Sequence, residues 1–522
     1  MDNKKVLAMY DIRGKQAFIF RTNKLKEIVG GSWIIRDLFN DYLYDVAKDD
    51  GSKGIFNYND KSVTDEEKKF TKKNFEKHLQ EGYIGEVVYD GGGNFLLLFE
   101  DKDTFKDVTY RFTKKVYEEV GTLQVLAACT EIDNFSNFER DRKELYKKHR
   151  ELESSESVID PWACLPIVQV DRATSLPIAF YDKSISEKYS KESWAKIRKY
   201  NDNIKIVHKR REGVDDDKKD AEALFVDNIN ILDELVHEKG EDSQLAVLFI
   251  DGNGMGARVQ NILKKAKSSS YEDCVEKMRE FSEKIRDVYT EKGIKSAFND
   301  SKDKSGNDYK KHRIVVYSGD ETSFIVQARD AYNVARSYLD SFDVDGDDSA
   351  CAGIAIFHSH APYADAYRIA EECCESGKKW MKDNEIDNAC LIDYHICQGA
   401  IGTSLDNIRD KDVGKLCSKP WLYTLKGVQA KENDKAVTIA EVEQLKQFFN
   451  TIGHSNVKDL AKCAKVGEAE LEMELKRIEA HQSDTDRKEE QWKFINHMDK
   501  EKRRKLIYDV VLAYDFWFKG GK

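Results

Sequence analysis

Two stretches of the chain decide the fold: Leu245-Ala-Val-Leu-Phe-Ile-Asp251-Gly-Asn-Gly-Met-Gly256 and Arg313-Ile-Val-Val-Tyr-Ser318-Gly-Asp-Glu321-Thr-Ser-Phe-Ile-Val-Gln327. In the first, an unbroken apolar run, typical of a strand buried on both faces, ends at Asp251, and the glycines that follow free the backbone. In the second, two apolar runs flank a short turn, which predicts a β-hairpin with two adjacent acids at its tip. If the two strands lie side by side, the carboxylates of Asp251, Asp320 and Glu321 converge.

Such a convergence suggests a metal site. Hard oxygen ligands at strand ends are what Mg²⁺ or Mn²⁺ requires when it also holds a nucleoside triphosphate. A Gly-Asp pair is also common turn chemistry, so either stretch alone would indicate only a turn. The ordered set of strand, helical interval and acidic hairpin favours metal-dependent nucleotide chemistry. The candidate catalytic and metal-binding residues are Asp251, Asp320 and Glu321, and the candidate nucleotide contacts beside them are Asn253, Ser318 and Gly319.

The N-terminal region repeats this pattern. Asp11-Ile-Arg-Gly matches Asp251-Gly-Asn-Gly, and a second apolar hairpin carries Gly91-Gly-Gly-Asn94 at its tip. Gly93 and Asn94 therefore occupy the places of Asp320 and Glu321. The first copy lacks the hairpin acids that would share a metal ion.

These motifs resemble the catalytic palm of the large CRISPR polymerase subunit, CRISPR-associated protein ten of type III effector complexes, and more distantly the GGDEF-type diguanylate cyclases. Ser349-Ala-Cys-Ala-Gly-Ile-Ala-Ile356 and the later Ala370-Glu-Glu-Cys-Cys-Glu-Ser-Gly-Lys378 resemble the strand and helix that close such palms. The resemblance places Lys378 where that helix carries a phosphate-contacting lysine. It also implies that the degenerate first palm holds a nucleotide through Asp11 and the turn residues Gly91, Gly92, Gly93 and Asn94.

The family's activity is an expectation that rests on this resemblance. It implies nucleotidyl transfer that joins ATP or another NTP into cyclic or short linear oligoadenylates, which serve as antiviral second messengers. Many relatives have Asp where this chain has Asn253 and Glu321, so the second metal ion is expected to be held less tightly and Mn²⁺ to support more activity than Mg²⁺. The chain has no His-Asp dipeptide and no zinc-type cysteine spacing, which suggests a compact form without the family's HD nuclease domain.

Composition indicates a globular protein. Its 522 residues suffice for roughly two to four domains, 40% are apolar and 35% are charged. The net charge of −11 argues against a surface that grips nucleic acid throughout, although a local basic groove leaves nucleic acid binding open. Ten scattered cysteines without C-x-x-C pairs suggest reduced thiols. With no signal peptide and no apolar run of membrane length, we expect a cytoplasmic protein without a membrane role.

Helical segments precede and follow the palm motifs. After the first strand, residues 15–49 predict helix interrupted at Gly30-Gly31, with Ser32 either binding a phosphate at a new helix start or serving only as a cap. Near the C-terminus, Thr438-x-x-Glu441 predicts a capping box. The apolar stripe of the last helix predicts packing against the palm or a partner. In the family a helical domain in this place meets a small effector subunit.

We therefore predict an α+β protein with two ferredoxin-like palms and a C-terminal helical domain. The expected ranges are 1–158 for the first, degenerate palm, 159–240 for a connector, 241–400 for the catalytic palm and 401–522 for the helical domain. Two other functions stay open. A non-catalytic nucleotide-binding scaffold in a type III-like RNA-guided complex would bind ATP without making a bond, whereas a templated polymerase would need a basic template groove. The helical domain is a candidate surface for CRISPR effector subunits or for a homo-oligomer.

Overall fold

The computed structural model forms two compact units that interleave along the chain. One contains residues 1–231, 254–291 and 314–322, and the other contains residues 232–253, 292–313 and 323–522. The structure describes residues 4–48, 51–60, 62–91, 93–155, 167–211, 232–236, 240, 242–265, 270–298, 312–344, 346–398, 404–412, 416–425, 436–482 and 489–519.

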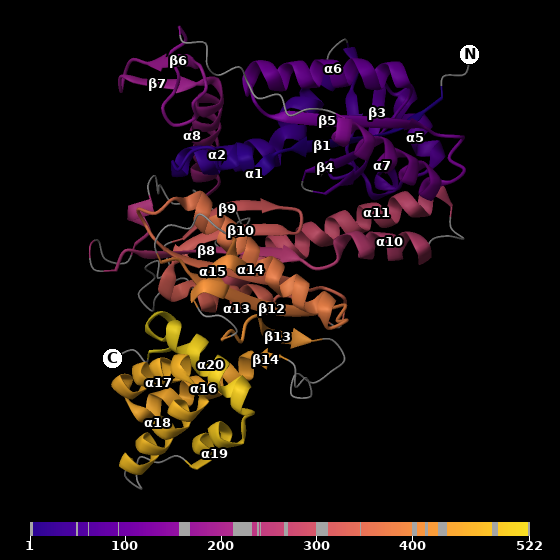
Figure 1. The fold of residues 1–522 in the computed structure, drawn as a ribbon. Helices are drawn as coiled ribbons and strands as arrows, with labels where there is room; N and C mark the ends of the chain where they lie inside the picture. The colour runs from indigo at the N-terminus through magenta and orange to yellow at the C-terminus, as the bar shows by residue number, and fades with distance from the viewer. Residues whose placement is uncertain are drawn as a thin grey trace. The chain divides into compact units, whose positions relative to one another are not determined.

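The first unit contains a five-stranded sheet in the order β2-β3-β4-β1-β5 (Figure 1). The central strand β1 is antiparallel to both β4 and β5, and its residues from Val6 to Tyr10 are all buried. This is the strand order of a ferredoxin-like palm, as predicted. The strands are β1 (Val6–Arg13), β2 (Gly54–Phe56), β3 (Tyr83–Asp90), β4 (Asn94–Phe99) and β5 (Gln124–Glu131).

The first unit also contains helices and one small hairpin. The helices are α1 (Lys15–Ile19), α2 (Leu25–Leu38), the π-helical turn η1 (Phe39–Leu43), α3 (Tyr44–Ala47), α4 (Asp65–Lys68), α5 (Lys72–Gln80), α6 (Lys102–Glu119), α7 (Phe138–Ser155) and α8 (Lys191–Arg211). The small hairpin consists of β6 (Ile178–Asp182) and β7 (Glu187–Ser190).

The predicted helix break at Gly30-Gly31 is wrong, because α2 runs through both glycines. A Cβ on Gly30 would lie 2.0 Å from the carbonyl oxygen of Lys196 in α8, so the glycine permits close helix packing and does not end the helix. Ser32 is buried in the middle of α2. It is not a helix cap, and the backbone around it offers no free helix start for a phosphate.

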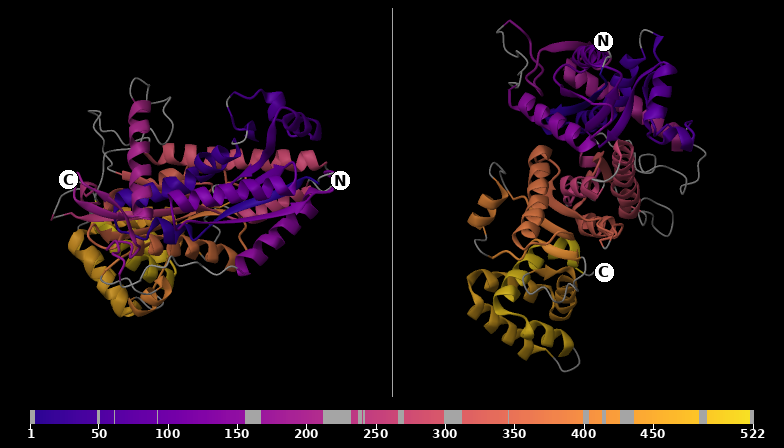
Figure 2. Two further views of the ribbon diagram at one scale, coloured as in Figure 1. Left: turned by 90° about the horizontal axis from the view of Figure 1, so that it is seen from above. Right: turned by 90° about the vertical axis from the view of Figure 1, so that its right-hand side faces the viewer.

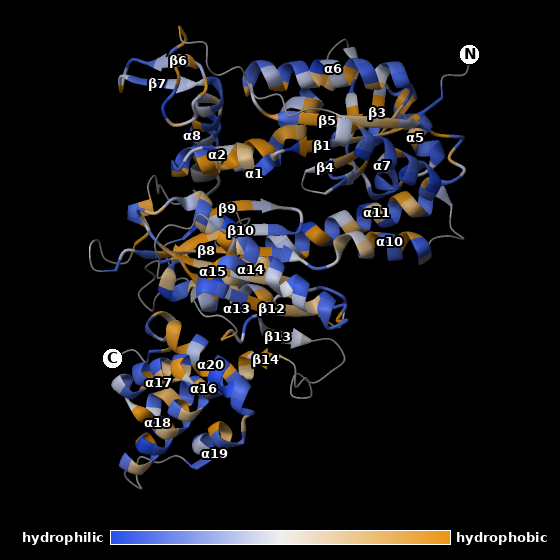
Figure 3. Ribbon diagram, in the orientation of Figure 1, coloured by the Kyte–Doolittle hydropathy of each residue, from blue (hydrophilic) through white to orange (hydrophobic). Residues whose placement is uncertain are grey.

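The second palm has the same strand order within a larger sheet, β14-β13-β12-β11-β8-β10-β9. Four of these strands repeat the first palm, with β11, β8, β10 and β9 in the places of β5, β1, β4 and β3. Strand β8 is hydrophobic along most of its length (Figure 3). The strands are β8 (Gln244–Gly252), β9 (His312–Ser318), β10 (Glu321–Gln327), β11 (Ala350–His358), β12 (Ala389–Ile396), β13 (Trp421–Leu425) and β14 (Val437–Thr438).

The connecting elements of this region are distributed between the two compact units. They are η4 (Leu232–Glu234), α10 (Met255–Lys265), α11 (Tyr271–Ile285), the π-helical segment η5 (Arg286–Lys292), α12 (Gly293–Phe298), η6 (Ala328–Asp330), α13 (Ala331–Leu339), α14 (Tyr363–Asp383) and α15 (Leu405–Asp412).

Helix α11 belongs to the first unit because it packs on β3. Its Arg279 side chain is almost fully buried and donates hydrogen bonds to Glu86 Oε1 at 2.7 Å and to the carbonyl oxygen of Val87 at 2.5 Å. His78 Nδ1 lies 2.9 Å from the other carboxylate oxygen of Glu86. A buried charge pair with several hydrogen bonds thus links a helix encoded between β8 and β9 to the first sheet.

The C-terminal helices form one group within the second unit (Figure 2). The predicted capping box is confirmed, since Thr438 Oγ1 accepts from the backbone N–H of Glu441 at 3.2 Å. Packing of the last apolar stripe against the palm is also confirmed: Trp517 stacks on Tyr332 and donates to the carbonyl oxygen of Ala328 at 2.8 Å. The elements are α16 (Ile439–Ile452), α17 (His454–Val466), α18 (Glu468–His481), α19 (Glu489–His497), α20 (Lys500–Leu512) and η8 (Tyr514–Phe518).

Two further expectations concern cysteines and membranes. The nine cysteines of the described ranges are all free, and five of them are buried. Over the same ranges, no helix is both long enough and apolar enough to cross a bilayer.

Candidate nucleotide-binding and catalytic site

The first palm brings Asp11 and its hairpin turn together. Asp11 on β1 pairs directly with Asn94, the first residue of β4. Gly93 has a φ of 136°, a backbone conformation that favours glycine, and Gly92 lies outside the described residues. The repeat predicted from sequence therefore places the strand-end aspartate opposite the hairpin, as a palm requires.

The Asp11 carboxylate faces the ammonium group of Lys15 and the imidazole of His149. Lys15 Nζ lies 3.8 Å from Asp11 Oδ1, and His149 Nε2 of α7 lies 3.7 Å from Asp11 Oδ2. Lys15 also fills the space beside Gly93, because a Cβ there would lie 2.1 Å from its ammonium nitrogen. Burial raises the pKa of Asp11 above its usual value, against the opposing effects of Lys15 and His149. The ammonium group of Lys15 thus lies beside Asp11, the strand-end aspartate whose hairpin turn carries no acids.

The acidic turn of the second palm is built as a tight reversal. Ser318 ends β9, Gly319 and Asp320 make the turn, and Glu321 begins β10. Gly319 has a φ of 65°, which an L-residue rarely adopts, and its carbonyl oxygen accepts from Thr290 Oγ1 at 3.5 Å. The predicted hairpin is confirmed, and both acids are half-buried.

Asp251 lies one residue before the end of β8 and forms an ion pair with Lys378 of α14. Lys378 also lies 3.3 Å from Glu375. Burial alone would lower the pKa of Lys378, but the Asp251 carboxylate outweighs burial and raises that pKa well above its usual value. The lysine that the resemblance assigns to phosphate contact is therefore held against the candidate catalytic aspartate, and its contact with a phosphate stays a prediction.

Asn253 is buried and holds the loop in place. Its side-chain amide donates to Ser349 Oγ at 3.1 Å and to the carbonyl oxygen of Ala389 at 2.8 Å, and its backbone N–H donates to the carbonyl oxygen of Ser349 at 2.9 Å. Asn253 Oδ1 is buried without a hydrogen-bond partner among the described residues. These contacts give Asn253 a positioning role, while its predicted contact with a nucleotide stays untested.

The oxygen donors suit a hard divalent cation, and they belong to different units: Asp320 and Glu321 lie in the first unit and Asp251 lies in the second. Across the described ranges, no three His, Cys, Asp or Glu side chains form a group that could hold a metal ion. Mg²⁺ at nucleotide sites usually takes only one or two carboxylates and completes its shell with water and phosphate oxygens. A cation that arrives with its nucleotide would therefore need only one or two of these carboxylates, and a site shared by Asp251 with Asp320 and Glu321 stays a prediction.

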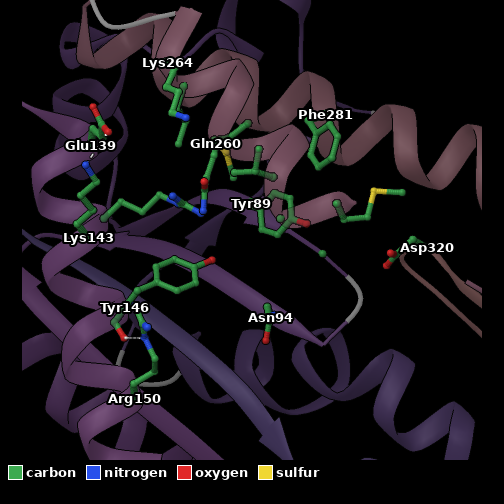
Figure 4. Close-up of a pocket in the computed structure, with 17 residues that line it drawn as sticks. Tyr89, Asn94, Glu139, Lys143, Tyr146, Arg150, Gln260, Lys264, Phe281 and Asp320 are labelled. Atoms are coloured by element: carbon green, nitrogen blue, oxygen red, sulfur yellow. Dashed lines mark hydrogen bonds and ion pairs between the residues drawn. The ribbon is translucent and has the colours of Figure 1, made fainter. Parts of the chain in front are cut away.

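A pocket of about 660 Å³ within the first unit joins the two turns (Figure 4). Gly91 and Asn94 from the first-palm turn and Asp320 from the acidic turn all line it. Met255 and Gly256, which follow the Asp251 motif, line it as well. Its volume lies within the range of roughly 300–1,000 Å³ that is common for small-molecule sites. Asp320 and Asn94 therefore line one cavity.

Helix α7 supplies most of the positive charge of this pocket. Figure 4 shows Lys143, Tyr146 and Arg150 on one side of the pocket and Asp320 on the other. Lys143 is paired with Glu139 at 2.8 Å. The pocket's four cationic side chains, Arg142, Lys143, Arg150 and Lys264, exceed its two carboxylates, Glu139 and Asp320, by two charges.

Of these cations, Arg142 gives the clearest indication of what the pocket binds. Its guanidinium lies 4.6 Å from the centroid of the Tyr146 ring, and its buried Nε has no hydrogen-bond partner among the described residues. Tyr89 lines the pocket as well, and burial, followed by the Asp320 carboxylate, raises the pKa of its phenol. An arginine with spare donors beside aromatic rings is suited to bind phosphate near a stacked base.

Sequence reasoning missed this basic and aromatic side of the pocket, because residues 134–157 show only a charged helix. A signal was present: Arg142, Tyr146 and Arg150 are spaced by four residues and so share one helix face. Only their position beside the two turns distinguishes this face from an ordinary solvated one.

Comparison with known proteins identifies the second palm. Residues 244–386 match the family model "Cas10/Cmr2, second palm domain". This segment therefore resembles a Cas10/Cmr2 second palm. The resemblance to the CRISPR polymerase family is thereby confirmed, together with the predicted α+β fold of palms and C-terminal helices. A search of curated proteins found no match.

Solved structures of Csm1–Csm4 cassettes are similar to this chain. A crystal structure of a Csm1–Csm4 cassette in complex with cA4 has 13% identity and a TM-score of 0.45, covering 76% of this chain and 54% of the other. Another crystal structure, in complex with pppApApA, has 12% identity and a TM-score of 0.49. The match covers 98% of this chain and 69% of the other. This chain thus corresponds to about half the length of the first of these relatives.

Proposed function

We propose that the protein is a metal-dependent nucleotidyltransferase that joins nucleoside triphosphates across the pocket between the two turns. The observation that carries this proposal is that Asp320 shares a cavity with Gly91 and Asn94, while the same cavity has a surplus of two positive charges. Asp320, an acid for a metal ion, stands on one side, and the turn that contains Gly91 and Asn94 stands on the other without an acid. This asymmetry suits one activated nucleotide and one acceptor nucleotide.

The residues divide into two groups by role. Asp251, Asp320 and Glu321 would hold Mg²⁺ or Mn²⁺ with the triphosphate of the activated nucleotide, helped by the backbone at Ser318 and Gly319. When bound, the cation supplies neutralisation of the charge that develops on the phosphates. Asp11 and the Gly91–Asn94 turn would position the acceptor nucleotide. The α7 arginines would bind phosphate oxygens, and Tyr89 and Tyr146 would contact a base.

The transfer itself needs alignment and charge stabilisation. The 3′-oxygen of the acceptor forms a bond to the α-phosphorus, the bond from that phosphorus to the oxygen of the β-phosphate breaks, and pyrophosphate leaves with the electron pair. The hydroxyl proton passes to water. Fixed cations such as Arg142 stabilise the developing negative charge, because they are already oriented and partly desolvated.

The substrate and product follow from the family. We propose ATP as the nucleotide and cyclic or short linear oligoadenylate as the product, an antiviral second messenger. Relatives crystallised with AMPPNP, pppApA and cA3 support this choice of chemistry. The helical domain is a candidate surface for other effector subunits, and the Csm1–Csm4 cassettes are complexes of this kind.

A non-catalytic nucleotide-binding scaffold is the second candidate. The ion pair between Asp251 and Lys378 favours it, because a carboxylate held by an ammonium group is not free for a metal ion. In this case the pocket would bind ATP and stabilise an effector complex without forming a bond.

One experiment separates these functions. The purified full chain is incubated with each NTP and Mg²⁺ or Mn²⁺, and the products are identified by mass spectrometry beside an Asp320→Asn control. Oligonucleotides that form without template and disappear in the control support the transferase. ATP binding without product supports the scaffold, and product that requires an added template supports a polymerase.

A further inference from the structure

A second cationic pocket lies at the other end of the second-palm sheet. It has a volume of about 380 Å³ and is lined by the end of β12, by α15 and by the C-terminal helices α17 and α20. Strand pairing sets its distance from the candidate site. Asp251 pairs with Cys351, whereas Ile396 of the pocket pairs with Ile356, five residues further along β11. Five residues of strand span about 16 Å, so the two sites are separate.

Two of the four cations in this pocket are neutralised. Arg409 donates to both carboxylate oxygens of Asp393, at 3.0 and 2.6 Å. Lys419 Nζ lies 3.3 Å from Asp509, which also accepts from the backbone N–H of Ser418 at 2.6 Å. These pairs anchor α15 and α20 to the sheet, and the two aspartates balance the two cations.

The other two cations are uncompensated. Lys411 and Lys465 line the same pocket, and neither forms an ion pair or hydrogen bond with any residue that the structure describes. Four cationic side chains against Asp393 and Asp509 leave a surplus of two positive charges. Like charges that face one cavity repel each other, so this arrangement is stabilised by an anion.

The interior of the pocket also offers unused polar groups. Arg409 Nε is buried and has no hydrogen-bond partner among the described residues. His395 lines the pocket, and burial, followed by the charges of Lys419 and Arg409, lowers its pKa to about 4. The imidazole is therefore neutral near pH 7 and supplies one donor and one acceptor without adding charge.

We propose that this pocket binds the phosphate group of a small anion, either free pyrophosphate or the terminal phosphate of a nucleotide. A phosphate dianion matches the surplus of two charges, and its oxygens accept from ammonium, guanidinium and imidazole donors. Because the lining residues come from the palm sheet, α15 and the C-terminal helices, bound phosphate stabilises the junction of the palm with the helical domain. The proposal stands independently of any transfer chemistry.

The test measures binding to the full chain in EDTA, which removes metal-dependent binding at the acidic turn. Calorimetry with inorganic phosphate, pyrophosphate and ATP as separate probes compares the wild type, Lys411→Ala/Lys465→Ala and the control Lys462→Ala. Lys462 lies on α17 and is already paired with Asp459 at 2.7 Å. We expect the double variant to bind about 10-fold or more weakly, and the control to bind as the wild type does.

The Arg142→Ala/Arg150→Ala variant removes two cations of the first pocket and so controls for binding there. We expect this variant to keep the affinity that the lysine variant loses. If the lysine variant loses affinity only for pyrophosphate, the ligand is a free anion. If it loses affinity for ATP to the same extent, the ligand is a nucleotide. Unchanged affinity of the lysine variant, no measurable binding of any probe to the wild type, or complete loss in the α7 variant would overturn the proposal. None of these results depends on whether the chain makes oligonucleotides.

Discussion

Replacement of Arg142 by alanine tests the proposed transferase most directly. The guanidinium lines the pocket that contains Asp320, stacks near Tyr146 and has no ion-pair partner among the described residues. Its removal therefore leaves no carboxylate unpaired, and we expect folding stability to change by less than about 1 kcal/mol. An effect on activity can then be assigned to substrate interactions.

The magnitude follows from the contact that is lost. A hydrogen bond between a charged donor and a phosphate contributes about 1.5–3 kcal/mol. Loss of one such bond lowers kcat/KM roughly 10- to 150-fold. Arg142→Lys keeps the charge but loses the planar fork, so we expect an intermediate value.

The assay is the initial rate of product formation over a range of ATP concentrations. Lys147→Ala is the matched control, because Lys147 lies on the same helix, is exposed and does not line this pocket. If Arg142→Ala and Lys147→Ala both kept the wild-type kcat/KM while Asp320→Asn was inactive, phosphate would not be bound by the α7 face.

Four further outcomes are expected. Asp320→Asn should lower the rate on the order of 10³-fold or more while ATP still binds, as equilibrium dialysis would show; near-normal turnover would refute the assignment of the acidic turn. At saturating ATP, Asp251→Ala should be inactive whereas Asp11→Ala should recover much of its kcat, and equal loss in two folded variants would contradict the division of roles between the palms. Mn²⁺ should support faster turnover than Mg²⁺, and equal rates would remove the support for a weakly held second cation. Arg279→Met should lower the free energy of unfolding by about 3–5 kcal/mol, measured by urea denaturation, because Glu86 loses its buried cation.

Local patterns were sufficient to predict both palms. An unbroken apolar run followed by Asp251 and glycines predicted β8 and its reversal, and the flanked Ser318–Glu321 turn predicted the hairpin that the structure contains. These features depend on strand burial and turn geometry, which neighbouring residues determine. The repeat was predictable for the same reason, and the pairing of Asp11 with Asn94 confirms it.

Local patterns failed where packing between distant segments decides the outcome. Gly30-Gly31 predicted a helix break, but α8 packs so closely on α2 that glycines are needed inside a continuous helix. A glycine pair has the same backbone preferences at a helix break and inside a continuous helix, so only the packing of α8 distinguishes the two outcomes.

The sequence by itself determined which residues end the palm strands, which turn carries acids and which does not. Only the tertiary structure decided that the α7 face lines the same cavity as Asp320 and that Asp251 faces Lys378. The physical reason is the separation along the chain over which each feature is determined. Strand burial and turn conformation are set within a few residues, whereas the charge of a pocket is the sum over side chains that folding brings together from separate parts of the chain.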